Sequence, residues 1–182
     1  MTFDFSGIWI PLITPLQNDA VDHVALIHLI KRYRTSGIRG FASLSTTGEA
    51  SLLNLEEQDA VLETTLQAAQ GLPVIAGLTA NTFAQAQIRI QQLSQFKISG
   101  IMVSSPSYIR PSQQGLIEYF TRLADLSPIP LIIYEIPYRP GIQLELSSLL
   151  VLAKHPNIQA IKDCAGSAAI TQALIHSGGL QV

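Results

Sequence analysis

The segment IQAIKDC, residues 158–164, is typical of a buried strand that ends in a charged side chain. Mostly apolar residues fill its first half, yet Lys162 stands near its end. A lysine in that place can simply extend its ammonium group into water. A lysine that is withdrawn from water, in contrast, loses its charge easily, and a neutral amine attacks carbonyl carbons. The two interpretations differ in where the end of this strand lies in the fold.

Short apolar runs like this one recur at roughly 30-residue intervals, with amphipathic segments between them. Between the first two runs, Leu26 and Ile30 lie on one face of a predicted helix that Asp22 can cap. Asn54 and Glu57 have the spacing of a capping box before a second helix. Such alternation predicts βα units and a parallel sheet. The predicted strands cover residues 8–14, 40–45, 73–78, 100–105, 130–136 and 158–163.

The length of the chain bears on which parallel fold these units form. A closed (β/α)8 barrel takes about 250 residues, whereas this chain has 182. It holds six βα units and, at Leu180, the start of a seventh strand. A doubly wound open sheet would fit the length better, but the motifs described below favour a barrel. We therefore expect one domain, residues 1–182, that is an incomplete α/β TIM barrel.

Composition excludes several classes of protein. Hydrophobic residues make up 47% of the chain and charged residues only 13%, so much of the sheet must be covered on both sides. A net charge of -2 provides no basic surface for nucleic acid, and no apolar run is long enough for a membrane span. Cys164 is the single cysteine, which excludes an internal disulfide, and no Cys/His cluster has zinc-ligand spacing. Without a signal-peptide pattern, we expect a cytoplasmic protein.

Polar side chains gather where the predicted strands end. In parallel folds, functional groups collect at the carboxyl ends of the strands. Hydroxyls, phenols, a guanidinium and an amine at one mouth suit a 2-oxo acid, because the lysine can condense with the ketone while the other groups move protons and hold carboxylates. These candidates are Thr46, Thr47 and Gly48 in STTGE, Tyr108 in PSY, Tyr134 and Arg139 in YEIPYR, and Lys162.

Each candidate also has a purely structural interpretation. Tyrosines at strand ends commonly pack with the hydroxyl bonded to backbone, which is an alternative for Tyr108 and Tyr134. The TTGE segment can be a turn in which Gly48 permits the backbone conformation. Arg139 lies between prolines and can be a surface residue on a rigid loop. The combination of residues argues for function more strongly than any one of them.

Four motifs together resemble one family. STTGEA, PSYIRPSQQGL, YEIPYRPG and the IKD of residues 161–163 occur in the order and at the spacing of the dihydrodipicolinate synthase and N-acetylneuraminate lyase group of class I aldolases. The resemblance extends from about Gly7 to the last residue. It implies a (β/α)8 barrel followed by a small helical domain, of which this chain lacks the last two βα units and the helical domain.

The resemblance also implies a role for each strand-end residue. Lys162 matches the lysine that forms a Schiff base with pyruvate, so that no metal or organic cofactor is needed. Tyr134 matches a phenol that relays protons, and Thr46 would connect it to Tyr108. In this family that second phenol reaches into the site of a neighbouring subunit, which implies a homo-oligomer, commonly a tetramer built from dimers.

Three further matches concern substrate binding. Thr47 would hold the pyruvate carboxylate through its hydroxyl and backbone, beside Gly48. Arg139 matches the arginine that binds the carboxylate of the second substrate in the synthase branch, which favours L-aspartate semialdehyde as the aldehyde acceptor. Two alternatives stay open: another 2-oxo-acid aldolase or dehydratase of the family, and a truncated chain without activity.

Several positions depart from the family. Ser45 stands where glycine is usual, and Glu135 stands where asparagine is common and is expected to bring a carboxylate near the site. In synthases that are inhibited by lysine, an interface pocket uses histidines, a glutamate and a tyrosine. The matching residues here are Leu55, Gln58, Gln85 and Ser107, with only Asn81 retained, which predicts insensitivity to lysine.

Overall fold

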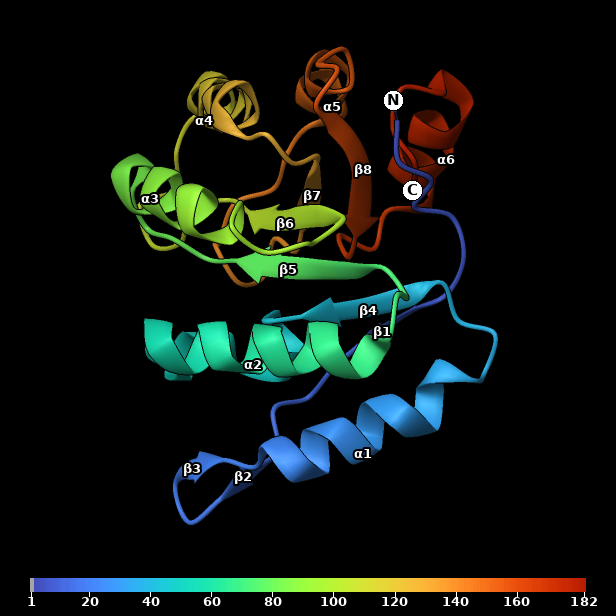
Figure 1. Cartoon of the computed structure of the whole chain (residues 1–182). Helices are drawn as coiled ribbons and strands as arrows, with labels where there is room; N and C mark the ends of the chain where they lie inside the picture. The colour runs from blue at the N-terminus through green and yellow to red at the C-terminus, as the bar shows by residue number, and fades with distance from the viewer. Residues whose placement is uncertain (1) are drawn as a thin grey trace.

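A computed structural model describes residues 2–182 (Figure 1). Its main feature is a six-stranded sheet in which every neighbouring pair of strands is parallel. The sheet order follows the chain order: β1 (Trp9–Pro11), β4 (Gly40–Ser43), β5 (Val74–Leu78), β6 (Gly100–Ser104), β7 (Leu131–Glu135) and β8 (Ile158–Asp163).

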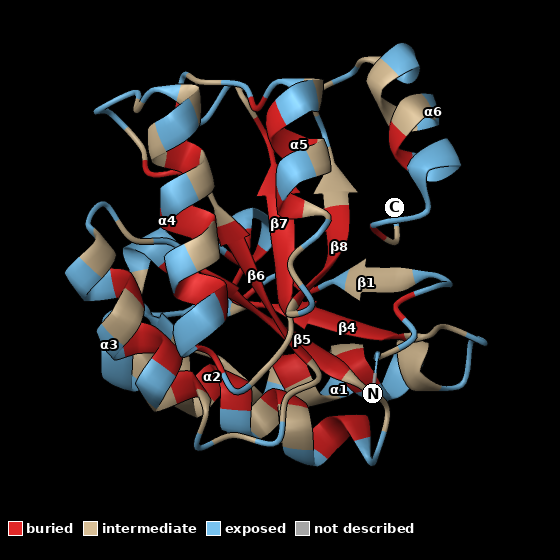
Figure 2. Ribbon diagram, turned by 90° about the horizontal axis from the view of Figure 1, so that it is seen from above, coloured by how far each residue is buried: buried red, intermediate tan, exposed pale blue. Residues whose placement is uncertain are grey.

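The sheet curls into a half-barrel with the helices on its outer side (Figure 2). All six predicted strands are present, although β1 is shorter than predicted. The expected start of a seventh strand is also confirmed, because Gln181 pairs in parallel with Ala160 of β8, and its carbonyl accepts the N–H of Ile161 at 2.8 Å. The chain thus forms the incomplete TIM barrel that its sequence predicts.

Six helices follow the strands: α1 (His23–Arg34), α2 (Leu55–Ala69), α3 (Phe83–Leu93), α4 (Gln113–Leu126), α5 (Leu146–Leu152) and α6 (Ala168–Ser177). The predicted caps are confirmed. Asp22 accepts the N–H of Ala25, and Asn54 and Glu57 form a reciprocal capping box. The turn considered for TTGE is present as the 3₁₀ turn η1 (Thr46–Gly48), and a second 3₁₀ turn, η2 (Ala50–Leu52), follows it. A hairpin of β2 (Leu16–Gln17) and β3 (Ala20–Val21) was not predicted from sequence. Among residues 2–182, no helix is long and apolar enough to span a membrane.

Alternate residues of each strand face opposite sides of the sheet, which produces two separate apolar clusters. The outer cluster packs the sheet against the helices and includes Phe41, Val74, Ile101, Leu131 and Ile161. The inner cluster fills the concave side. Its strand residues are Ala42, Ile75, Met102, Ile132, Tyr134 and Ala160.

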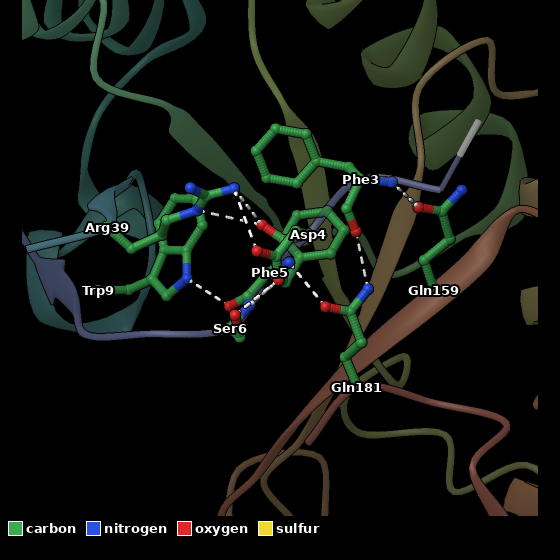
Figure 3. Close-up of polar contacts among 8 residues, drawn as sticks. All are labelled: Phe3, Asp4, Phe5, Ser6, Trp9, Arg39, Gln159 and Gln181. Carbon is green, nitrogen blue, oxygen red and sulfur yellow. Dashed lines mark hydrogen bonds and ion pairs between the residues drawn. The ribbon is translucent and has the colours of Figure 1, made fainter.

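The N-terminal segment packs against the inner cluster and is hydrogen-bonded to Gln159 and Gln181 (Figure 3). Phe5 is buried in the inner cluster, with Phe3 and Trp9 packed around it. The backbone N–H of Phe3 donates to Gln159 at 2.9 Å, and that of Phe5 donates to Gln181 at 2.7 Å. The first residues are thereby tied to the last two strands, so the opposite ends of the chain stabilise one another.

A tight bend follows β4 and directs the next residues toward the carboxyl ends of the strands. Leu44 is buried and has a φ of 57°, a left-handed conformation that costs free energy in a bulky residue. The bend presses against β5 at Gly77, where an added Cβ would overlap the carbonyl oxygen of Leu44. Only glycine fits there without displacement of backbone.

We predict that Gly77→Ala destabilises the chain by about 1–3 kcal/mol, as expected for overpacking against a rigid neighbour. The matched control is Gly115→Ala in α4, where a Cβ has ordinary contacts and a helical glycine is replaced. That control should be neutral or stabilising by up to about 1 kcal/mol. Urea unfolding of both variants measures the difference, and equal midpoints would contradict the close approach at Gly77.

Candidate active site

Lys162 and Tyr134 are adjacent because β7 and β8 pair in a specific register. Tyr134 is opposite Lys162 in the parallel ladder, so both side chains project from the same face. That face is the concave one, since Tyr134 belongs to the inner cluster. The Lys162 Nζ lies 4.3 Å from the centroid of the Tyr134 ring. Tyr134 is buried and Lys162 is half-buried, so the amine stands at the boundary between the packed interior and the open mouth.

An irregularity in β8 produces this orientation. Leu131 pairs with Ile158, but Ile132 pairs with Ala160, so Gln159 is an extra residue on β8. Ile158 belongs to the outer cluster and Ala160 to the inner one, and regular alternation resumes from Ala160 onward. If residues 158–162 alternated strictly, with no bulge at Gln159, Lys162 would share the outer face with Ile158.

A cavity of about 400 Å³ opens at the carboxyl ends of the strands, and we call it the strand-end cavity. Thr46, Tyr134 and Arg139 line it. The structure therefore brings together three of the residues that sequence analysis singled out, from η1, β7 and the loop after β7. Lys162 itself does not line this cavity, and its amine is linked to it only through the Tyr134 ring, which does.

Thr47 and Gly48 do not line this cavity. Thr47 is exposed, whereas Gly48 is buried beneath η1. The carbonyl of Gly48 accepts a hydrogen bond from the Thr14 hydroxyl at 2.7 Å, and an added Cβ at Gly48 would lie 3.0 Å from the carbonyl oxygen of Leu12. The glycine thus anchors the turn that presents Thr46, and Thr14 is a supporting residue that sequence analysis missed.

Tyr108 also lies outside the cavity, in the loop after β6. Its side chain is 95% exposed, and its φ is 74°. An aromatic residue in the left-handed region is an outlier that surrounding structure must maintain. The loop therefore holds a large apolar ring in water at a cost in conformational energy.

Glu135 lies behind the site, which corrects the expectation from sequence. It follows Tyr134 in β7, so its side chain projects from the outer face of the sheet, and it does not line the strand-end cavity. Glu135 is 2% exposed and accepts the N–H of Leu144 at 3.1 Å. The pKa of Glu135 is raised to about 7, mainly by burial and in smaller part by nearby Asp163, while the hydrogen bond from Leu144 acts in the opposite direction.

Two serines of the strand-end cavity have buried hydroxyls: Ser45, which was noted from sequence as a departure from the family, and Ser105, which was not singled out. Both residues line the cavity, and their side-chain oxygens are buried and have no hydrogen-bond partner. Both residues follow apolar strands, in SLS and VSS, and this position is the signal that could have identified them. In the described part of the chain, no cluster of histidine, cysteine or carboxylate side chains could hold a metal ion.

A second cavity, of about 480 Å³, lies beside the first between α2 and α3, and we call it the α2–α3 cavity. Leu55, Gln58, Asn81 and Gln85 line it. These are four of the five positions that resemblance matched to an interface lysine pocket. The fifth, Ser107, donates its hydroxyl to Asn81 at 2.6 Å.

Comparison with known proteins identifies the family. The model of the Dihydrodipicolinate synthetase family matches residues 4–178. The chain belongs to this family. It is 34% identical over 170 residues to 4-hydroxy-tetrahydrodipicolinate synthase 2 of Clostridium acetobutylicum, covering 93% of this chain and 59% of that protein. It is 37% identical over 164 residues to the corresponding synthase of Syntrophus aciditrophicus, covering 90% and 56%.

The family fold is equally clear from solved structures. The chloride-inhibited dihydrodipicolinate synthase of Acinetobacter baumannii, complexed with pyruvate, superposes with a TM-score of 0.93 at 30% sequence identity. The match covers 97% of this chain and 62% of that one. The chain thus spans less than two thirds of the length of these relatives.

We predict that Glu135→Gln flattens the pH dependence of stability. The folded state raises the pKa of Glu135 from 4.5 to about 7, so this carboxyl favours folding while it is protonated. Its stabilising contribution is complete below pH 4.5 and is lost as the pH rises to about 7, with a total on the order of 3 kcal/mol. Glutamine keeps the acceptor for Leu144 but cannot ionise.

Urea unfolding at several pH values tests this prediction. The variant should match the parent at acidic pH and exceed it in stability at pH 8. Glu63→Gln, on the exposed face of α2, is the control and should leave the pH profile of the parent intact. If the free energy of unfolding of Glu135→Gln changed with pH as steeply as that of the parent, the Glu135 carboxyl would not titrate between pH 4.5 and about 7.

Proposed function

We propose that this chain carries the Schiff-base site of a pyruvate-dependent lyase of the 4-hydroxy-tetrahydrodipicolinate synthase type. The observation that carries the proposal is the Lys162 amine, 4.3 Å from the Tyr134 ring centroid at the carboxyl end of the half-barrel. Amine nucleophiles of this kind condense with ketones without a metal or organic cofactor. Membership of the family supports the same reaction type.

The proposed reaction begins with bond formation between Lys162 Nζ and C2 of pyruvate. The C2 oxygen leaves as water after it accepts protons, and Tyr134 is the nearby phenol that can relay them. The imine then withdraws electrons from the methyl group, which loses a proton and becomes an enamine carbon. That carbon forms a C–C bond with the aldehyde carbon, and the aldehyde oxygen takes up a proton. Attack by water or by an amine on the imine carbon frees Nζ.

Other strand-end residues are assigned supporting roles in this proposal. Thr46 lines the cavity with Tyr134 and is suited to pass protons between the phenol and its surroundings. Thr47 and Gly48 would supply hydroxyl and backbone donors to the pyruvate carboxylate from the η1 turn. Because neither lines the strand-end cavity, this role requires pyruvate to bind above η1, on the side of Lys162.

Arg139 supports a carboxylate-bearing aldehyde as the acceptor, and we propose L-aspartate semialdehyde. Arg139 lines the strand-end cavity, and its planar guanidinium can form paired hydrogen bonds with a carboxylate. A second candidate is an aldolase or dehydratase of the same family with another acceptor. That alternative draws support from the buried Ser45 and Ser105 hydroxyls, which suit a hydroxylated aldehyde.

Tyr108 supports action as a homo-oligomer. Its exposed ring, held in a strained loop conformation, is in the state expected of a residue that another subunit covers. In the proposed assembly this phenol completes the proton relay of a neighbouring site. The third candidate, a chain that has no activity by itself, follows from the fraction of its relatives that it spans.

We predict that pyruvate and borohydride label Lys162. Reduction of the imine should leave one carboxyethyl group on a peptide that contains this residue, detected by mass spectrometry after proteolysis. Lys162→Arg should abolish the label, because a guanidinium does not form the imine. Lys154→Arg, at an exposed lysine, should label like the parent. If the parent chain acquires no label at Lys162, the catalytic proposal fails for this chain.

We predict that Arg139→Ala lowers kcat/KM for L-aspartate semialdehyde by about 10–100-fold, the loss expected when a charged hydrogen-bond donor is removed. Labelling by pyruvate and borohydride should persist, which separates acceptor binding from imine formation. Arg32→Ala, on the exposed face of α1, is the control for loss of charge. If the parent chain turned over a sugar aldehyde that lacks a carboxylate as fast as L-aspartate semialdehyde, that result would instead support the second candidate.

A further inference from the structure

The segment between β7 and α5 carries Arg139, and we call residues 136–143 the β7–α5 loop. Two hydrogen bonds inside the loop form turns. The N–H of Arg139 donates to the carbonyl of Ile136 at 3.0 Å, and the N–H of Gly141 donates to the carbonyl of Pro137 at 2.9 Å. Because these turns hold the loop together, the points where the loop is attached determine where the guanidinium lies.

Glu135 attaches this loop to the sheet. Its carboxyl accepts the N–H of Leu144, the residue directly after the loop, at 3.1 Å, and both residues are buried. The backbone carbonyl of Glu135 accepts the N–H of Cys164 at 2.8 Å, two residues after Lys162. Tyr134 immediately precedes Glu135 in β7. One residue is therefore connected to the proposed phenol, to the strand of the lysine and to the loop of the guanidinium.

The other attachment of the loop leads away from β7. Gln113 of α4 donates its amide N–H to the carbonyl of Gln143 at 2.8 Å, and its oxygen accepts the N–H of Glu145 at 3.0 Å. These two bonds connect the end of the loop to α4. Among residues 2–182, the bond from Leu144 to the Glu135 carboxyl is the one hydrogen bond that connects the end of the loop to β7.

Stability alone does not account for a carboxyl at this place. Ile133, the preceding outer-face residue of β7, and Leu144 both belong to the outer apolar cluster. Glu135 is also paired in the ladder with Asp163, a second acidic residue. Burial and this neighbour raise the pKa of Glu135 to about 7, which shows that its charged form is disfavoured there. A side chain that stabilised the fold by burial alone would be apolar.

We propose that Glu135 is a positioning residue for acceptor binding, whose carboxyl fixes the β7–α5 loop, and with it Arg139, relative to Tyr134 and Lys162. This inference rests on the proposed function, in which Arg139 binds the carboxylate of the aldehyde. Glu135 projects from the face opposite the site and does not touch substrate, so it acts through Arg139. Loss of its hydrogen bond should weaken acceptor binding and leave imine formation intact, because a guanidinium binds well only when it is held in place.

The kinetic test compares two substitutions of Glu135. Glu135→Met keeps an unbranched chain of similar length but offers only a weak acceptor, and it should raise KM for L-aspartate semialdehyde about five- to tenfold. Labelling of Lys162 by pyruvate and borohydride should match the parent. Glu135→Gln should restore KM, because its amide oxygen accepts the N–H of Leu144. Thr65→Val, which removes a buried hydrogen bond within α2, controls for lost stability and should leave KM unchanged.

A double substitution separates positioning from general damage. In an Arg139→Ala background, Glu135→Met should cause no further rise in KM, because the group through which Glu135 acts is gone. A further rise of the same size, or a parental KM in Glu135→Met alone, would overturn the proposal. If near-UV circular dichroism shows that Glu135→Met is unfolded, Glu135→Leu takes its place.

A ¹⁵N spectrum of the whole chain tests the positioning role without turnover. In Glu135→Met, the amide of Leu144 should lose protection from hydrogen exchange and the Arg139 Nε signal should shift, whereas Glu135→Gln should keep both. These changes in a chain that acquires no label at Lys162 would refute the proposed reaction but uphold the positioning of Arg139. Labelling of Lys162 with unchanged Leu144 and Arg139 signals would instead refute the role of Glu135 and leave the reaction standing.

Discussion

The register between β7 and β8 is the constraint on which the candidate site depends. Parallel pairing sets Tyr134 opposite Lys162, and the extra residue Gln159 decides which face of the sheet they share. Side chains alternate strictly along a strand, so a single added residue reverses the direction of everything after it. Here the reversal buries Ile161 under the helices and brings the amine to the concave side. The position of one bulge therefore determines whether Lys162 lies on the outer face or on the concave face as a candidate nucleophile.

Other parts of the fold keep that register in place. The side chain of Gln159 accepts the N–H of Phe3, and the backbone of Gln159 accepts the N–H of Gln181. The bulge is thus held from both sides, by the N-terminal segment and by the beginning of the seventh strand. On the outer face, Asp163 accepts from Ala165 and from the Thr171 hydroxyl, which fixes the chain just after Lys162. The end of β8 is therefore held in place by packing on the concave face and by hydrogen bonds on the outer face.

Much of the fold could be predicted from sequence because each strand is a short apolar run with its own helix. Asp22, Asn54 and Glu57 marked helix starts correctly, since capping is a local interaction. The bulge at Gln159 could not be predicted, because it depends on pairing with β7, and a period-two count along β8 gives the opposite orientation for Lys162. Glu135 is a different case, because alternation along β7 already sets its side chain on the face opposite Tyr134, and the expectation from family resemblance did not take this into account.

The candidate site also combines features that could be predicted from sequence with features that could not. Thr46, Tyr134 and Arg139 could be grouped from sequence because all follow strands of one parallel sheet, whose carboxyl ends must meet. Gly48 was grouped with them by the same rule, yet it turns inward to bond Thr14, a residue distant in sequence. Exposure of Tyr108 and burial of Arg89 are likewise properties of packing between elements. Motif order predicts which residues come near the mouth, and tertiary contacts decide which of them face it.

Polar groups without partners mark the places where this chain departs from maximal stability. In the described residues, buried side-chain atoms without a hydrogen bond occur on Ser45, Arg89, Ser105 and Tyr119. Three of these four residues line the two cavities at the carboxyl ends of the strands. A fold stabilised only by burial would fill such positions with apolar side chains, because each unpaired group costs about 1–3 kcal/mol. The unpaired groups are concentrated around two adjacent cavities. In natural proteins, local departures of this kind from an otherwise consistent sequence are expected at functional sites.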